Sequence, residues 1–267
     1  MTNLGPLGAS HSTTDTAEPS AAVATATELE ELGYATLWIS GGQGNTLPRI
    51  TELLHGTNRI QVASGILSVD RVPPGEVAAA YADLPAGRFV VGLGGAHGPR
   101  PLATLGAYLD EIDVAVPASA RILSALGPKM LELARDRASG AYPYLVTTDY
   151  VASARELLGP GPRLVVGLSV VAGTDVAAVR ETVRGGGSLK FLAGMPGYAA
   201  NFRRMGFTDA DIADLSDRLV DGLTVWGDFD AVVARLREYR AAGADQVVVP
   251  LDGVPREWWP ELVKALA

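Results

Sequence analysis

Apolar residues fall into short and long runs that alternate along the whole chain. Two of the short runs, Arg59–Ile66 and Arg163–Val171, are β-branched and show little alternation of apolar and polar positions, which is typical of strands buried on both faces of a parallel sheet. We expect eight strands, at Asn3–Ala9, Ala35–Ile39, Arg59–Ile66, Arg88–Leu93, Ala120–Leu126, Ala141–Leu145, Arg163–Val171 and Gln246–Leu251.

The longer runs are bounded by residues that are typical of helix ends. Thr147 stands where it can cap a helix, and Thr208 with Asp211 three residues later resembles a capping box. Asp228 opens the run Phe229–Ala242, whose apolar residues share one helical face.

Eight strands alternating with helices in about 250 residues predict a (β/α)8 barrel. An open doubly wound sheet is the alternative, but it usually has fewer strands and needs a switch point. No linker rich in Pro, Gly or Ser divides the chain, so residues 1–267 are expected to form one domain. The stretch Gly173–Gly243 is too long for a single crossover, and extra helices are expected there, between strands 7 and 8 and over the barrel mouth.

Composition and charge exclude several classes of function. The net charge of −8 makes nucleic acid and anionic membrane surfaces poor partners, and the absence of cysteine excludes disulfides, zinc thiolates and cysteine nucleophiles. No His-x-x-x-His or tight His/Asp/Glu cluster is present, so no metal site is expected. A long apolar span and a signal-like start are also absent, so the expected location is cytoplasmic.

In a barrel, the active site lies at the carboxyl ends of the strands. Directly after the fourth expected strand come Gly94, Gly95 and His97, in a loop that lets backbone N–H groups approach a phosphate or a flat ring. The loop lacks the third glycine of a dinucleotide fingerprint, and no strong helix start follows, so a dinucleotide site is rejected. A plain tight turn remains the alternative to a ligand loop.

Two further segments end expected strands. Ser64, Gly65, Ile66 and Ser68 surround a glycine that indicates a bulge or a close approach of ligand, with a simple strand terminus as the alternative. The segment Leu126-Gly127-Pro128-Lys129 runs from a strand end straight into a helix. Free N–H groups at a helix start, with a lysine beside them, favour an anion site over a helix start with a solvated lysine.

The chain resembles the bacterial luciferase-like flavin oxidoreductases, and within them the actinobacterial branch assigned to the deazaflavin coenzyme F420. Six segments in the right order, spread over nearly the whole chain, carry the resemblance: residues 30–39, 57–66, 85–94, 125–134, 140–146 and 242–247. Typical motifs among them are Glu-Glu-Leu-Gly-Tyr-Ala-Thr-Leu-Trp-Ile and Pro-Ala-Gly-Arg-Phe-Val-Val-Gly-Leu-Gly.

The resemblance implies a TIM-type barrel with a flavin or deazaflavin ring in its mouth. It implies that a bulge at Gly65-Ile66, with a cis peptide bond, backs the ring, and that Gly94, Gly95 and His97 lie beside the cofactor. It also implies that the backbone of Leu126–Lys129 holds the cofactor phosphate, and that the protein is a homodimer.

Relatives often carry an acidic residue or a histidine just after the second strand, whereas this chain has Ser40-Gly41-Gly42. The proton donor expected from the family is therefore missing there, and His97 is the candidate catalytic residue, because its ordinary pKa near 6.5 suits proton transfer. The favoured function is an oxidoreductase that uses F420 to move a hydride to or from a small organic substrate. The alternatives are an FMN-dependent monooxygenase that uses O2, and a diverged barrel that binds flavin without catalysis.

Overall fold

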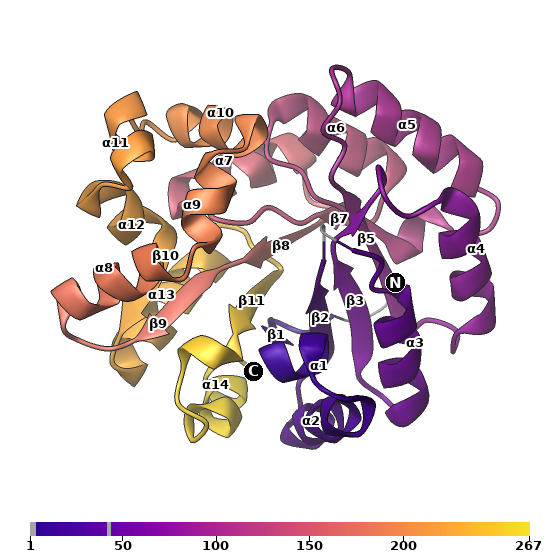
Figure 1. Ribbon diagram of the computed structural model, residues 1–267, viewed down its shortest axis with the longest axis horizontal. Coiled ribbons are helices and arrows are strands. Elements are labelled where there is room, and N and C mark those ends of the chain that lie inside the picture. The colour runs from indigo at the N-terminus through magenta and orange to yellow at the C-terminus, as the bar shows by residue number, and fades with distance from the viewer. Residues whose placement is uncertain (1–3, 42–43) are drawn as a thin grey trace.

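A computed structural model describes residues 4–41 and 44–267 and has the predicted (β/α)8 barrel (Figure 1). In the described part, strand β3 and the short strand β4 are two pieces of one barrel strand, interrupted at Gly65-Ile66, so the closed sheet has eight parallel strands. Pairing of β1 with β11 and of β3 with β5 completes the ring. The strands are β1 (Leu7–Ser10), β2 (Thr36–Ser40), β3 (Gln61–Gly65), β4 (Leu67–Ser68), β5 (Phe89–Gly94), β6 (Arg121–Leu123), β7 (Gly140–Ala141), β8 (Arg163–Gly167) and β11 (Gln246–Pro250).

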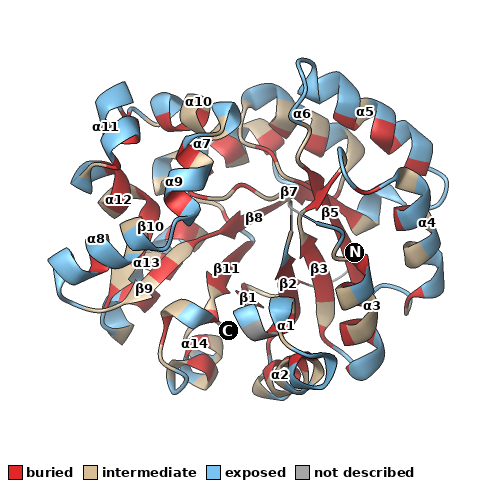
Figure 2. Cartoon of the chain, viewed as in Figure 1, coloured by how far each residue is buried: buried red, intermediate tan, exposed pale blue. Residues whose placement is uncertain are grey.

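Helices surround the sheet, with buried residues turned toward the strands and exposed residues outward (Figure 2). Their sequences set their ends: Thr147 and Asp228 cap helices by accepting backbone N–H bonds, as predicted. Several others begin at a proline, which fits a first helical turn. These elements are α1 (Ser12–Thr16), α2 (Pro19–Leu32), α3 (Leu47–Gly56), α4 (Pro74–Asp83), α5 (Pro101–Ile112), α6 (Pro128–Arg137), α7 (Thr148–Leu158), α13 (Phe229–Ala241) and α14 (Trp258–Leu266), with the short 3₁₀ turns η1 (Ala118–Ala120) and η2 (Leu251–Gly253).

The segment between β8 and β11 carries the extra helices that the sequence predicts. It also contains a two-stranded parallel ribbon, β9 with β10, that the sequence analysis missed. The expected strand Arg163–Val171 is divided at Leu168 into the barrel strand β8 and the ribbon strand β9. The segment comprises β9 (Ser169–Ala172), α8 (Val176–Gly185), α9 (Ser188–Ala193), α10 (Pro196–Arg204), α11 (Asp209–Asp214), α12 (Asp217–Leu223) and β10 (Thr224–Gly227).

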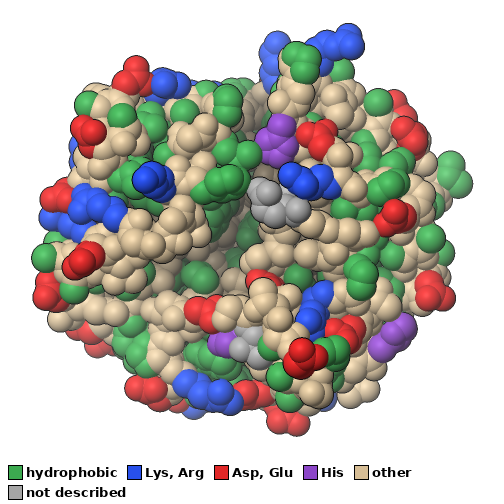
Figure 3. Space-filling view, viewed as in Figure 1, with side chains coloured by type: hydrophobic (Ala, Val, Ile, Leu, Met, Phe, Trp, Pro, Cys, Tyr) green, Lys and Arg blue, Asp and Glu red, His purple; other side chains and the backbone are tan. Residues whose placement is uncertain are grey.

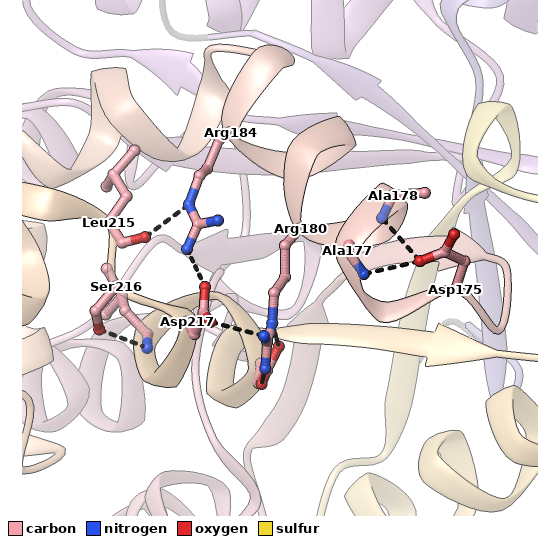
Figure 4. A network of polar contacts seen from close by, with 10 residues as sticks. Asp175, Ala177, Ala178, Arg180, Arg184, Leu215, Ser216 and Asp217 are labelled. Atoms are coloured by element: carbon pink, nitrogen blue, oxygen red, sulfur yellow. Dashed lines mark hydrogen bonds and ion pairs between the residues drawn. The ribbon is translucent and has the colours of Figure 1, made fainter.

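A small apolar core of its own and a polar network hold this inserted segment together. Phe202, Leu219 and Leu223 are buried in that core. On its surface, Arg180 and Arg184 of α8 both pair with Asp217 at the start of α12 (Figure 4). Shared carboxylates of this kind fix the two helices relative to each other more firmly than single exposed ion pairs do.

The barrel interior is filled below its mouth. Trp38, Ala63, Val90, Ile122 and Val248 form a buried layer inside the ring of strands. Because these side chains fill the interior, the barrel is not a pore, and a ligand can bind only at its carboxyl-end mouth. Within the described residues, no helix is both long and apolar enough to span a membrane.

Glu30 of α2 fixes the entry to β3. Its Oε2 accepts the backbone N–H groups of Asn58, Arg59 and Ile60 at 3.0, 2.5 and 2.8 Å. Burial alone would raise the pKa of Glu30, but these three bonds hold the pKa below its ordinary value. The carboxylate therefore stabilises the fold in its ionised form.

We expect Glu30→Ala to lower the free energy of unfolding by about 1–2 kcal/mol at pH 7, because the N–H of Ile60 is buried while water can reach the other two. Urea unfolding measures the loss, and the exposed neighbour Glu31→Ala serves as the control. Because the folded-state pKa is lowered, the difference should shrink as the pH falls below about 4. Equal losses in the two variants would contradict this assignment.

Candidate functional site

A cavity of about 460 Å³ opens at the carboxyl ends of the barrel strands. The end of every barrel strand contributes to its wall, and α9 with α10 forms a cover on one side. Figure 3 shows the same face of the molecule hollowed near its centre, between apolar side chains. The cavity lies where the barrel argument placed the active site.

The back of the cavity is the interruption between β3 and β4. The Gly65-Ile66 peptide bond is cis, which confirms the prediction made from the family resemblance. Both residues line the cavity. Gly41 packs directly against them: its N–H donates to the Gly65 carbonyl at 3.2 Å, and a Cβ at Gly41 would lie 2.2 Å from the Ile66 oxygen. Close packing thus requires a glycine where relatives carry a proton donor; Gly42 lies outside the described residues.

The glycine loop after β5 borders the same space. Gly95 lines the cavity with φ of +70°, and a Cβ there would meet the Ser68 hydroxyl at 2.7 Å. The Ser68 hydroxyl in turn donates to the Gly95 carbonyl at 3.1 Å. Gly94 is buried behind this loop, and a Cβ on it would press on Ser124, a cavity residue. The glycines therefore let two loops approach each other and leave the mouth open.

Ser64 has a different task from its neighbours. It is fully buried, and its hydroxyl both donates to the Gly92 carbonyl at 2.9 Å and accepts the Gly92 N–H at 2.8 Å. These two bonds join β3 to β5 where the barrel closes. In this geometry, Ser64 supports the site and has no hydroxyl bond left to donate to a ligand.

His97 lines the cavity with its side chain 50% exposed. Asp70, which the sequence analysis missed, orients it: one Asp70 oxygen accepts the His97 backbone N–H at 2.8 Å and lies 3.3 Å from Nδ1. This pairing leaves Nε2 as the ring nitrogen free of the carboxylate. His97 therefore faces the mouth, as predicted.

The start of α6 adjoins the cavity through Ser124. Gly127 caps the helix without a side-chain bond, and Pro128, which has no N–H, opens the helix. The N–H groups of Met130 and Leu131 donate to the Gly127 carbonyl, so the Lys129 N–H is the one that stays available in the first turn. Leu126 is fixed by Tyr150, whose hydroxyl donates to its carbonyl at 2.9 Å. Lys129 is exposed and does not line the cavity.

Arg204 of α10 is a second cation at this helix start, and the sequence analysis missed it. Its Nη2 lies 3.6 Å from the position that a Gly127 Cβ would take. The Asn201 side-chain oxygen accepts bonds from the same guanidinium at 3.0 and 3.3 Å. Only the folding of the inserted segment back onto the barrel places this charge beside Gly127, which lies 77 residues earlier in the sequence.

Asp15 of α1 is a further group that the sequence analysis missed. Its Oδ1 accepts the backbone N–H of Ser40, a cavity residue, at 3.2 Å. Burial raises the pKa of Asp15 to about 6, with a smaller contribution from Asp252, while hydrogen bonds from Ser40 and the charge of Arg49 oppose the rise. A carboxyl group from α1 therefore lies beside the end of β2, although Asp15 itself does not line the cavity.

Comparisons with known proteins agree with this architecture. Residues 4–121 match the sequence profile of the Luciferase-like monooxygenase family, and no curated protein matches the chain. Coenzyme F420-dependent tetrahydromethanopterin reductase from Methanopyrus kandleri superimposes with a TM-score of 0.74 at 18% identity, covering 98% of each chain. The chain has a luciferase-like TIM-barrel fold.

Two other structures with this luciferase-like fold differ in the cofactor that they hold. An F420-dependent secondary alcohol dehydrogenase, solved with an F420-acetone adduct, gives a TM-score of 0.70 at 12% identity over 98% of each chain. The oxygenating constituent of 3,6-diketocamphane monooxygenase from Pseudomonas putida, solved with FMN, gives 0.63 at 14% identity over 92% of each chain. At these identities the likeness establishes the fold, and both cofactors occur among the neighbours.

Proposed function

We propose that this protein is a luciferase-like oxidoreductase that uses coenzyme F420 to transfer a hydride to or from a small organic substrate. The observation that carries the proposal is the cavity at the strand ends, backed by the Gly65-Ile66 bulge. The start of α6 follows the cavity residue Ser124, and we assign the cofactor phosphate to it. The bound cofactor would supply the hydride chemistry. We also propose that the protein is a cytoplasmic homodimer and belongs to the actinobacterial F420 branch.

The residues at the mouth fit a flat ring with a phosphate tail. Ile66 offers an apolar surface at the back of the cavity, and Gly95 has no side chain to occupy the space beside it. The Lys129 N–H at the start of α6, with the side chains of Arg204 and Lys129 near it, forms a positive end for a phosphate. The protein's task is to fix the ring against the substrate and to keep water out of the covered part.

Two groups are placed to move a proton beside the ring. His97 reaches the cavity with its Nδ1 side turned to Asp70, so Nε2 faces away from the carboxylate. Asp15 reaches Ser40 at the opposite side of the β3 bulge, and its pKa of about 6 suits exchange of a proton near neutral pH. We assign the catalytic role to His97 and a supporting proton exchange through Ser40 to Asp15.

An FMN-dependent monooxygenase using O2 is the second candidate, because a solved neighbour holds FMN in the same fold. The test is a titration of the purified protein with F420 and with FMN, followed by absorbance. Selective binding of F420 supports the proposal, and selective binding of FMN replaces it with the second candidate. Cofactor binding without turnover of any tested substrate would support the third alternative, a barrel that binds flavin without catalysis.

The same titration tests the anion site. We expect Arg204→Ala and Lys129→Ala each to raise the cofactor dissociation constant about three- to tenfold, because each removes a charged partner of the phosphate. Arg203→Ala is the matched control, since Arg203 pairs with Asp209 on the surface. If the phosphate binds elsewhere, all three variants will have the cofactor dissociation constant of the parent protein.

A further inference from the structure

Three tyrosine hydroxyls in the cavity have no hydrogen-bond partner among the described residues. They belong to Tyr142 after β7, Tyr144 beside it and Tyr198 of α10, and all three side chains line the cavity. Burial raises the pKa of each, and Tyr144 lies near enough to Tyr142 and Tyr198 to raise the pKa of both further. Each hydroxyl therefore stays protonated and remains a donor across the neutral range.

Four of the other five tyrosines donate their hydroxyl to a group of the protein itself. Tyr34, Tyr108, Tyr150 and Tyr239 all donate to backbone carbonyls, at 2.9, 2.9, 2.9 and 2.7 Å respectively. The hydroxyls of the three cavity tyrosines open into the cavity instead, so a ligand that accepts hydrogen bonds can pair with them there. The contrast separates the cavity tyrosines from those that serve the fold.

The described wall of the cavity holds no Asp, Glu, Lys or Arg side chain. His97, whose side chain is half exposed, is the one basic side chain among the described lining residues. A carboxylate or ammonium group buried among the tyrosines would have no counter-charge, and an unpaired buried charge is strongly unfavourable. The interior therefore selects an uncharged ligand.

The shape of the wall favours a ring. Tyr142 stacks on Trp38 at 4.3 Å between ring centroids and 21° between planes, which makes a flat aromatic floor. Phe191 and Met195, from α9 and its boundary with α10, add apolar side chains to the wall. An aromatic stack, apolar side chains and hydroxyl donors in one cavity suit a planar molecule that carries an oxygen at its edge.

We propose that the cavity binds an uncharged cyclic ketone or aromatic carbonyl compound, whose carbonyl oxygen accepts hydrogen bonds from Tyr142, Tyr144 and Tyr198. The inference rests on the proposed function only in calling this molecule the substrate. The binding of the carbonyl compound follows from the cavity walls alone. The tyrosines are the residues that determine specificity, and the Trp38–Tyr142 stack holds the ring.

Isothermal titration calorimetry on the protein without cofactor tests this with three ligands of nearly the same shape. These are 2-acetylnaphthalene, 2-naphthoate and 2-ethylnaphthalene, which carry a neutral carbonyl, a charged carboxylate and no oxygen. At pH 7.5 we expect the ketone to bind at least tenfold more tightly than either of the others. A carboxylate that binds as tightly as the ketone, or an oxygen-free ligand that does so, overturns the proposal.

Phenylalanine variants then locate the donors. Tyr142→Phe, Tyr144→Phe and Tyr198→Phe combined should weaken the ketone about tenfold or more and leave 2-ethylnaphthalene within twofold. Tyr81→Phe, which lies on α4 against Phe89 and away from the cavity, is the control, and thermal melts check that all variants fold. A ketone preference that survives in the combined variant overturns the assignment. Since no cofactor is present, failure of F420 and FMN to bind would count against the proposed function and not against this result.

Discussion

Gly41→Ala should both destabilise the protein and weaken cofactor binding. A Cβ at this position would lie 2.2 Å from the Ile66 carbonyl oxygen, a backbone atom that cannot turn aside. The neighbouring Gly41 N–H bond to Gly65 prevents the strand end from simply moving away. Overpacking of this kind costs about 2–3 kcal/mol. We expect a lower Tm by several degrees and a cofactor affinity reduced at least tenfold.

Gly75→Ala is the matched control for Gly41→Ala. Gly75 is exposed in the first turn of α4, and a Cβ there would have no atom within 4 Å. Thermal melts and the F420 or FMN titration on both variants measure the difference. A Gly41→Ala protein with the melting temperature and affinity of the parent would show that the β2 end and the β3 bulge do not depend on each other.

Asp15→Asn should make the protein more stable at pH 8 while slowing its reaction. The raised pKa of Asp15 means that its ionised form is unfavourable in the folded state, because burial outweighs the hydrogen bonds from Ser40. The amide keeps a similar shape without the charge. We expect a gain of about 1–2 kcal/mol in the free energy of unfolding, less than the full shift would give because Asp15 is partly exposed.

The pH dependence gives this prediction its sign. Above about pH 6, Asp15 is ionised in both the folded and the unfolded protein, and the full penalty is present. As the pH falls from 6 toward 4, the folded state takes up the proton first, so the advantage of the asparagine variant disappears. Urea unfolding at pH 8, 6 and 4 measures it, with the exposed Asp149→Asn as control. An advantage that stays constant with pH would contradict a titrating carboxyl group.

The proton exchange that we propose for Asp15 would lower the stability of the fold, and such opposition between stability and activity is common at enzyme sites. Glu30 shows the reverse case, because its pKa is lowered by three backbone bonds and its charge supports the fold. The two carboxylates differ through their surroundings alone.

Two of the three segments that the sequence places at strand ends line one mouth, whereas no residue of Leu126–Lys129 lines the cavity. Gly65, Ile66, Gly95 and His97 line the cavity, and their positions follow from chain-local signals, namely a β-branched run that stops at a glycine or a serine. Ser64 was expected among the contacts, but its hydroxyl is taken up by Gly92 across the strand boundary. No local signal distinguishes a serine that faces a ligand from one that joins two strands.

The sequence by itself determined the repeating order of strands and helices, and with it the barrel. Strands buried on both faces and helix caps can both be recognised from residues that are neighbours in the sequence. Only the tertiary structure decided which distant side chains share the mouth. Arg204 lies beside Gly127, and Asp15 binds the Ser40 N–H. These residues are far apart in the sequence, so a periodic pattern of apolar and polar positions cannot predict that they meet. The raised pKa of Asp15 is likewise a property of its burial in the folded chain. Loop paths over the barrel depend on packing between remote segments, and the free energy of that packing has no signature in any one segment.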